Sequence, residues 1–91
     1  MTITRKQVAD KFNVNITDVE QVKSQQLFII IKPDSMLLVS YLTIVGKYIN
    51  GVWYLTKQKY SVSTSRQMST FARTHNVKYV NDINNITEQE L

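Results

Sequence analysis

The dipeptide Asn50-Gly51 constrains the fold of this chain more than any other feature, because it separates two runs rich in β-branched and aromatic residues. Asn-Gly is the preferred pair for a two-residue type I′ turn, in which both central residues take positive φ. The runs on either side, residues 36–49 and 52–56, are therefore predicted to form an antiparallel hairpin. The turn also sets the register of the paired residues: Ile49 with Val52, Tyr48 with Trp53, and Lys47 with Tyr54.

Side chains alternate between the two sides of a strand, so this register divides the hairpin into two faces. The face predicted to form the core carries Leu42, Ile44, Tyr48, Trp53 and Leu55. The other face is mixed and is predicted to meet solvent or a partner; it carries Thr43, Val45, Lys47, Ile49, Val52, Tyr54 and Thr56.

Further elements are predicted on both sides of the hairpin. Residues 27–31 form a continuous apolar run that ends before Pro33, which is typical of a buried strand. A helix from Thr64 to His75 is indicated by a capping box of Thr64 with Gln67 at its start. An apolar stripe at helical spacing supports it and consists of Met68, Phe71, Ala72 and His75. Residues 77–80 alternate like a short closing strand.

The N-terminal segment, residues 1–26, has the apolar spacing of a helix-turn-helix. Thr4 is predicted to cap a first helix, Asn13 to form the turn, and a second helix to bury Val19 and Val22. A helical hairpin packed on a sheet needs the same spacing, so a structural role and a DNA-reading role both remain open. The carboxylates of Asp18 and Glu20, on the exposed side of the second helix, would repel phosphates, which favours the structural role.

The predicted fold is therefore α+β, and residues 1–91 form a single domain. It begins with an N-terminal helical hairpin (residues 1–26), continues with an antiparallel sheet of three to four strands and one C-terminal helix packed on it (residues 27–80), and ends in a polar, acidic tail (residues 81–91). Because a chain of 91 residues without cysteine has a small core and no disulfides, a homodimer would complete part of that core.

The sequence offers little that could carry catalysis or hold a metal. It has no cysteine and a single histidine, His75, which is predicted to pack or to cap a helix. The acidic residues are scattered, and with only two glycines there is no glycine-rich phosphate loop. We therefore expect no enzyme activity, no cofactor and no metal.

Membrane insertion and secretion are both disfavoured by the sequence. No apolar stretch reaches the roughly 20 residues that a membrane span requires. The N-terminal residues lack the apolar centre of a signal peptide. The expected location is therefore the cytoplasm, with no membrane partner.

The middle of the chain is its basic part. The formal net charge is +4, but residues 27–80 hold seven basic side chains and one acidic side chain, Asp34. Such a segment suits nucleic acid, because each neutralised phosphate releases condensed counterions. The alternative is that these charges are merely solvated. The predicted nucleic-acid site, in which basic side chains bind phosphates and tyrosines stack on bases, consists of Lys47, Tyr54, Lys57, Lys59, Tyr60, Arg66 and Arg73.

Three segments carry a resemblance: Ser40-Tyr41-Leu42-Thr43-Ile44-Val45, the strand Asn50-Gly51-Val52-Trp53-Tyr54-Leu55-Thr56, and Lys59-Tyr60-Ser61-Val62-Ser63-Thr64-Ser65-Arg66-Gln67. Over residues 38–75 the chain resembles a group of small uncharacterised proteins of phages, plasmids and chromosomal islands of Gram-positive bacteria. Their shared pattern is a Ser-Tyr-x-Thr strand, a hairpin and a Tyr-Ser-x-Thr-Thr-Ser-Lys/Arg helix start. Ser63 stands where threonine is commoner, which keeps a hydroxyl. The resemblance implies a mobile-element setting and transfers no binding or catalytic residue.

Two functions follow from these observations. The leading one is a non-enzymatic nucleic-acid-binding accessory or regulatory protein of a phage or mobile element, with DNA as its partner. The alternative is a phage-encoded protein inhibitor of a host defence nuclease complex, of the anti-CRISPR kind, which acts by binding a host protein.

Overall fold

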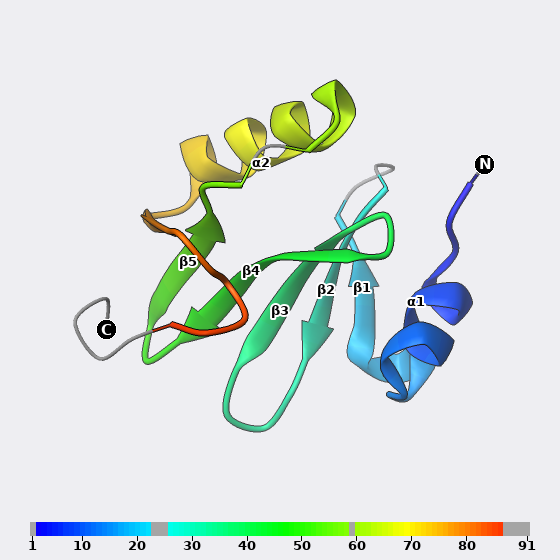
Figure 1. Cartoon of the computed structure of the whole chain (residues 1–91). Coiled ribbons are helices and arrows are strands. Elements are labelled where there is room, and N and C mark those ends of the chain that lie inside the picture. Colours follow the sequence, from blue (N-terminus) through cyan, green and yellow to red (C-terminus); the bar gives the residue numbers. More distant parts are fainter. Residues whose placement is uncertain (1, 23–25, 59, 87–91) are drawn as a thin grey trace.

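The computed structural model describes residues 2–22, 26–58 and 60–86, which form an α+β fold around one mixed six-stranded sheet (Figure 1). Each strand pairs with the strand that follows it along the chain. The strands are Val19–Gln21 (β1), Leu27–Ile31 (β2), Met36–Ser40 (β3), Thr43–Ile49 (β4), Val52–Thr56 (β5) and Val77–Val80 (β6), and the helices are Arg5–Phe12 (α1) and Val62–Thr74 (α2). All neighbouring strands are antiparallel except β5 and β6, which are parallel because α2 crosses over between them.

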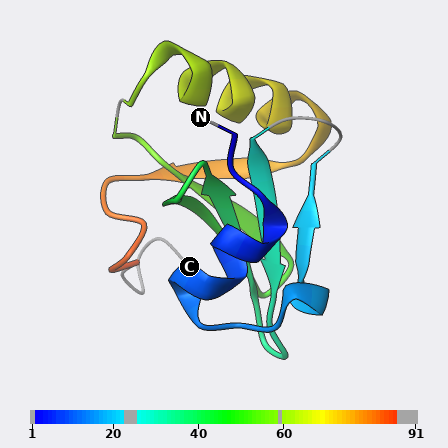
Figure 2. The same ribbon diagram turned by 90° about the vertical axis from the view of Figure 1, so that its right-hand side faces the viewer.

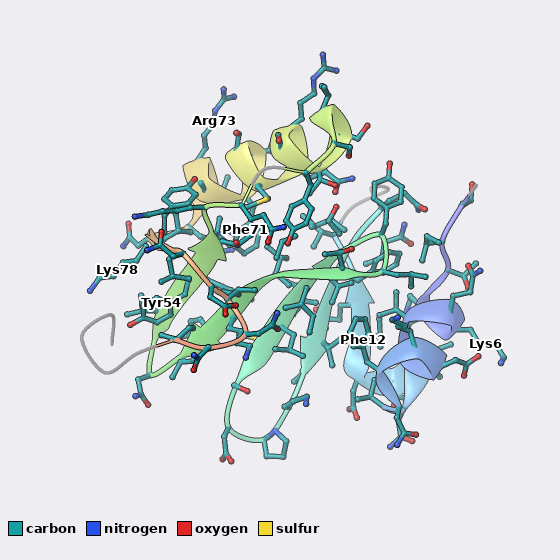
Figure 3. The ribbon with its side chains drawn as sticks, in the orientation of Figure 1. Lys6, Phe12, Tyr54, Phe71, Arg73 and Lys78 are labelled. Carbon is teal, nitrogen blue, oxygen red and sulfur yellow. The ribbon has the colours of Figure 1, made fainter. Side chains whose placement is uncertain are left out.

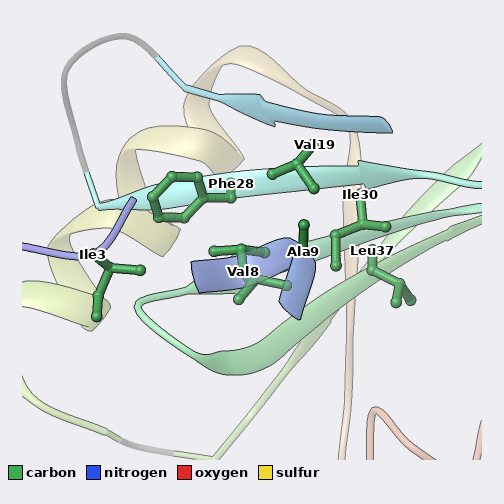
Figure 4. Packing of buried hydrophobic residues seen from close by; sticks show 8 residues of the cluster. Ile3, Val8, Ala9, Val19, Phe28, Ile30 and Leu37 are labelled. Carbon is green, nitrogen blue, oxygen red and sulfur yellow. The ribbon is translucent and has the colours of Figure 1, made fainter. Parts of the chain in front are cut away.

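The two helices cover opposite faces of the sheet. Val8 of α1 belongs to a buried cluster with Phe28 of β2 on the first face (Figure 4). Met68 and Phe71 of α2 pack with Trp53 of β5 on the second face. In both views of the ribbon α2 forms an outer side of the molecule (Figures 1 and 2), which leaves the other side of this helix facing outward.

The predicted N-terminal helical hairpin is wrong, although its first helix is present. α1 has a capping box between Thr4 and Gln7 and ends at Asn13 in the left-handed conformation, with φ of 53°. Where the second helix was expected, Ile16–Asp18 form a single turn of 3-10 helix (η1) and Val19 begins β1. The described residues of this segment therefore form no second α-helix that could enter a DNA groove.

A strand forms there because tertiary pairing outweighs the helical spacing. Val19 lies opposite Ile30 at the edge of β2, and its β-branched side chain is fully buried in the cluster that contains α1. Arg5 fastens α1 to this strand: its Nε donates to the carbonyl oxygen of Val19 at 2.7 Å, and its Nη2 donates to that of Ile16 at 3.0 Å.

The hairpin at Asn50-Gly51 has the predicted register. The two turn residues have φ of 52° and 84°, and Tyr48 lies opposite Trp53. The run predicted as one strand over residues 36–49 is instead two strands, β3 and β4, joined by a turn in which Tyr41 has φ of 56°. The sheet therefore has six strands rather than three to four, and the β5–β6 pair makes it mixed rather than antiparallel.

A β-bulge in β4 overturns part of the predicted division into faces. The pairing of β3 with β4 shifts by one residue there, and Val45 is the extra residue. As a result Ile44 and Leu42 pack on the α1 side, and Val45 packs on the α2 side with Leu55. Next to the bulge, a side chain on Gly46 would force its neighbours to shift, since a Cβ would lie 2.7 Å from Leu55 Cδ2 and 3.1 Å from Leu38 Cβ.

α2 begins earlier than predicted. Its N-cap is Ser61, whose Oγ accepts a hydrogen bond from the backbone N–H of Thr64 at 3.2 Å. Thr64 therefore lies within the first turn of the helix rather than before it, and its side chain is buried. Within the described residues no helix is long and apolar enough to cross a membrane.

Candidate nucleic-acid interface

The outer side of α2 carries a stripe of side chains that faces away from the sheet. The inner side buries Thr64, Met68 and Phe71. Residues of a helix advance by about 100° each, so residues spaced by four, three and four line up along one side. Opposite the buried side, this stripe is Val62, Arg66, Ser69 and Arg73. Figure 3 shows the side chain of Arg73 extending away from the molecule.

We call the surface around this stripe the arginine face; it consists of Val62, Ser65, Arg66, Ser69, Thr70 and Arg73. With Tyr60, these residues line a shallow, open depression of about 560 Å³. All six side chains are exposed, and Val62 reaches 69%. On the outer side of the helix, the exposed side chains between the two arginines are the small hydroxyl side chains of Ser69 and Thr70, so a ligand can approach the backbone closely.

No carboxylate among the described residues pairs with the charges of the arginine face. Among the described residues the ion pair found is Lys6 with Asp10, at 3.1 Å on α1, and it involves neither arginine of this face. The sequence contains no acidic residue between Asp34 and Asp82, a stretch that includes all of α2. No carboxylate of a described residue therefore competes with an external anion for the donors of these two guanidinium groups.

A buried chain of hydroxyls fixes α2 to the sheet. Ser61 Oγ donates to Thr64 Oγ1 at 3.2 Å, and Ser40 Oγ donates to Gln67 Oε1 at 2.6 Å. The two halves meet where Ser40 Oγ lies 3.0 Å from Thr64 Oγ1. Because the hydroxyl proton of Ser40 is already used toward Gln67, Thr64 is the donor in this central hydrogen bond.

Each hydroxyl in the chain thus donates one hydrogen bond and accepts one. Ser40, at the end of β3, is 1% exposed, and Thr64 is 5% exposed. None of the described buried side-chain nitrogen or oxygen atoms lacks a hydrogen-bond partner. The chain holds the first two turns of α2 in one position, which pre-organises the arginine face.

We expect Ser40→Ala to lower the free energy of unfolding by about 1–3 kcal/mol, because it leaves the buried hydroxyl of Thr64 without an acceptor. Urea unfolding followed by the fluorescence of the single tryptophan, Trp53, measures this loss. Ser63→Ala on the exposed side of α2 is the matched control and should change stability by less than about 0.5 kcal/mol. Equal stability of the Ser40→Ala variant and the wild type would show that the hydroxyl chain does not stabilise the fold.

The structure brings together three of the predicted site residues: Arg66, Arg73 and Tyr60. Tyr60 is half-buried at the edge of the arginine face, and its hydroxyl donates to Gln58 Oε1 at 3.2 Å. Lys57 adjoins them, because it lines a neighbouring depression together with Ser65 and Ser69 of α2. Lys59 lies outside the described residues.

Lys47 and Tyr54 are not part of this surface. They lie opposite each other on β4 and β5, and Lys47 also lies opposite Leu37, which belongs to the α1 cluster. Directly opposed residues share a face, so both side chains point to the side of the sheet that α2 does not cover. Tyr54 is 1% exposed beneath Ile83, so it cannot stack on a base.

The sequence interpretation missed several members of the arginine face. Val62, Ser65, Ser69 and Thr70 were not among the predicted site residues. Outside the arginine face, Tyr79 was not among them either; it is 48% exposed beside Lys57. The sequence did contain a signal for the residues of this face that lie on α2. They occupy the helix positions opposite the apolar stripe, which the sequence had already identified.

His75 has a packing and capping role at the end of α2. Its ring stacks on that of Phe71 with a centroid distance of 4.0 Å. Its Nδ1 lies 3.1 Å from the carbonyl oxygen of Phe71 and 2.9 Å from Thr74 Oγ1. The described residues contain no group of three side chains suited to hold a metal ion.

Comparison of the chain with family models, with curated proteins and with solved structures finds no match.

Proposed function

We propose that this protein binds nucleic acid through the arginine face, as a non-enzymatic accessory or regulatory protein of a phage or mobile element. One observation carries the binding proposal: Arg66 and Arg73 lie on the exposed stripe of α2 without a carboxylate partner among the described residues. The mobile-element setting comes from the resemblance over residues 38–75.

The chemistry of the arginine face suits phosphate. Guanidinium groups donate in a planar fork that matches phosphate oxygens, and hydroxyls donate to the same oxygens. The two arginines are seven residues apart, which is about 10.5 Å along a helix. Lys57 extends the positive surface past Ser65 to the flank of α2. An extended polyanion can therefore meet all three cations at once.

The test is fluorescence anisotropy of a labelled DNA duplex titrated with the whole protein at about 50 mM and about 200 mM salt. Two to three phosphate contacts predict a slope of log K against log salt of about −1.8 to −2.7, and thus a 12- to 40-fold loss over that range, roughly. Absence of binding at the lower salt would contradict the proposal. A host nuclease subunit bound through the same face, without DNA binding, would favour the inhibitor alternative.

A further inference from the structure

We propose that α2 enters the major groove of duplex DNA and that Arg66 and Arg73 reach the base edges there. This inference rests on the proposed function and goes beyond it by naming the form of nucleic acid and the residues that read it. On unselected DNA the two arginines bind phosphates, and in a preferred site the same guanidinium groups turn to base edges.

The shape of α2 is the first argument. Its 13 residues span about 20 Å, and a helix with its side chains is about 10–12 Å across. The major groove of B-form DNA is about 12 Å wide and 8.5 Å deep. The side chains of Ser65, Ser69 and Thr70 are small, so on its outer side this helix is hardly wider than its backbone. The helix can therefore approach the groove floor.

The order of side chains around α2 is the second argument. Arg66 and Arg73 lie on the centre line of the outer side, where a docked helix meets base edges. Ser65 and Thr70 lie on either side of that line, where the groove walls bring phosphates. Lys57 lies beyond Ser65, beside the same wall. This division matches base contacts that specify sequence and phosphate contacts that position the protein.

The burial of Tyr54 is the third argument, because it disfavours single strands. Non-specific single-strand binding combines a positive groove with aromatic side chains on which bases stack. Tyr54 is buried, and Tyr60 is half-buried with its hydroxyl bonded to Gln58. On the α2 side, the well-exposed tyrosine among the described residues is Tyr79, beside Lys57 rather than on the stripe. Duplex RNA is disfavoured as well, since its major groove is too deep and narrow for side chains to read.

The spacing of the arginines predicts the binding site. Arginine binds guanine O6 and N7 through its planar fork. A separation of about 10.5 Å along the helix corresponds to at most roughly three base pairs at 3.4 Å per step, because a helix in the groove is inclined to the DNA axis. Selection from a random-sequence duplex library should therefore enrich two guanines about two to three base pairs apart. The variant Arg66→Lys/Arg73→Lys keeps both charges but loses both forks, so it should lose this enrichment while still binding unselected duplex.

The direct experiment is a competition assay with the full chain, in which fluorescence anisotropy measures how well other ligands displace the protein from a labelled DNA duplex. We expect a DNA duplex to bind at least about tenfold more tightly than a single strand or an RNA duplex of equal length. Methyl green, which occupies the major groove, should displace the protein, and netropsin, which occupies the minor groove, should not. Lys47→Gln on the opposite face is the control and should leave the competition unchanged.

The two proposals fail separately in this experiment. Displacement by netropsin, or equal affinity for single strands, overturns the groove assignment and leaves salt-dependent binding in place. Binding to no nucleic acid overturns both proposals. Selection without guanine enrichment removes the role given to the two arginines.

Discussion

Replacing Arg66 and Arg73 together by alanine should weaken binding to a DNA duplex at least about 30-fold. A good arginine contact is worth about 1–3 kcal/mol, so losing two costs at least about 2 kcal/mol, and each 1.4 kcal/mol is tenfold in affinity. Both side chains are exposed on α2 and make no ion pair with a described residue, so their loss should leave the fold intact. Anisotropy at constant salt measures the change in affinity, and circular dichroism checks the fold.

The charge-matched control for this variant is Lys47→Ala/Lys78→Ala. Lys78 lies opposite Tyr54 on β6, so both lysines are on the sheet face that α2 does not cover. The control removes the same net charge, and long-range attraction alone should cost less than about threefold at physiological salt, where the Debye length is about 8 Å. If both double variants lose affinity equally, net charge and not the arginine face accounts for binding.

Tyr54→Ala should lower the free energy of unfolding by about 3–5 kcal/mol, which is the usual cost of removing a large buried ring. Domains of this length are stable by about 5–14 kcal/mol, so the variant loses about a fifth of that or more. Tyr54 is 1% exposed and packs with Val80 and Ile83, which join the sheet to the chain after β6. Thermal unfolding followed by circular dichroism measures the loss.

Tyr79→Ala provides the matched control for Tyr54→Ala. It makes the same chemical change in a strand of the same sheet, but Tyr79 is 48% exposed. Its stability should change by less than about 1 kcal/mol. A comparable loss of stability in the two variants would mean that Tyr54 is not a buried core residue. Tyr54 would then again be a candidate for stacking on bases.

The parts of the fold that depend only on residues close together in the chain could be predicted from the sequence. The turn at Asn50-Gly51 sets φ and register within four residues, so the pairing of Tyr48 with Trp53 could be derived from sequence. The apolar stripe of α2 is likewise local. Since the exposed stripe is its complement, Arg66 and Arg73 were correctly assigned to a shared surface.

Long-range pairing decided what the sequence could not show. The spacing of Val19 and Val22 fits a helix. In the structure Val19 instead pairs with Ile30 at the edge of β2 and belongs to the strand β1. The bulge at Val45 depends on the partner strand β3, and it reverses the faces of Ile44 and its neighbours. The sequence predicted that the face carrying Tyr54 meets solvent or a partner. In the structure Ile83 packs on Tyr54, and the pairing could not be foreseen because Ile83 comes about 30 residues later, after α2.

The hydroxyl chain links two of the segments on which the resemblance rests. Ser40 and Thr64 are 24 residues apart and meet through a 3.0 Å hydrogen bond. Sequence reasoning assigned Thr64 and Gln67 to a capping box, because this pair has that spacing. In the structure both side chains turn inward to Ser40, and Ser61 caps the helix. These polar residues therefore set the position of α2 on the sheet.

Amide chemical-shift mapping tests most directly whether the arginine face is the binding surface. The 15N-labelled full chain is titrated with an unlabelled DNA duplex at low salt. The account predicts that the largest shifts fall on Val62, Ser65, Arg66, Ser69, Thr70 and Arg73, with smaller ones at Lys57 and Tyr60. Shifts concentrated on α1 or around Lys47 and Lys78, with α2 unaffected, would contradict it.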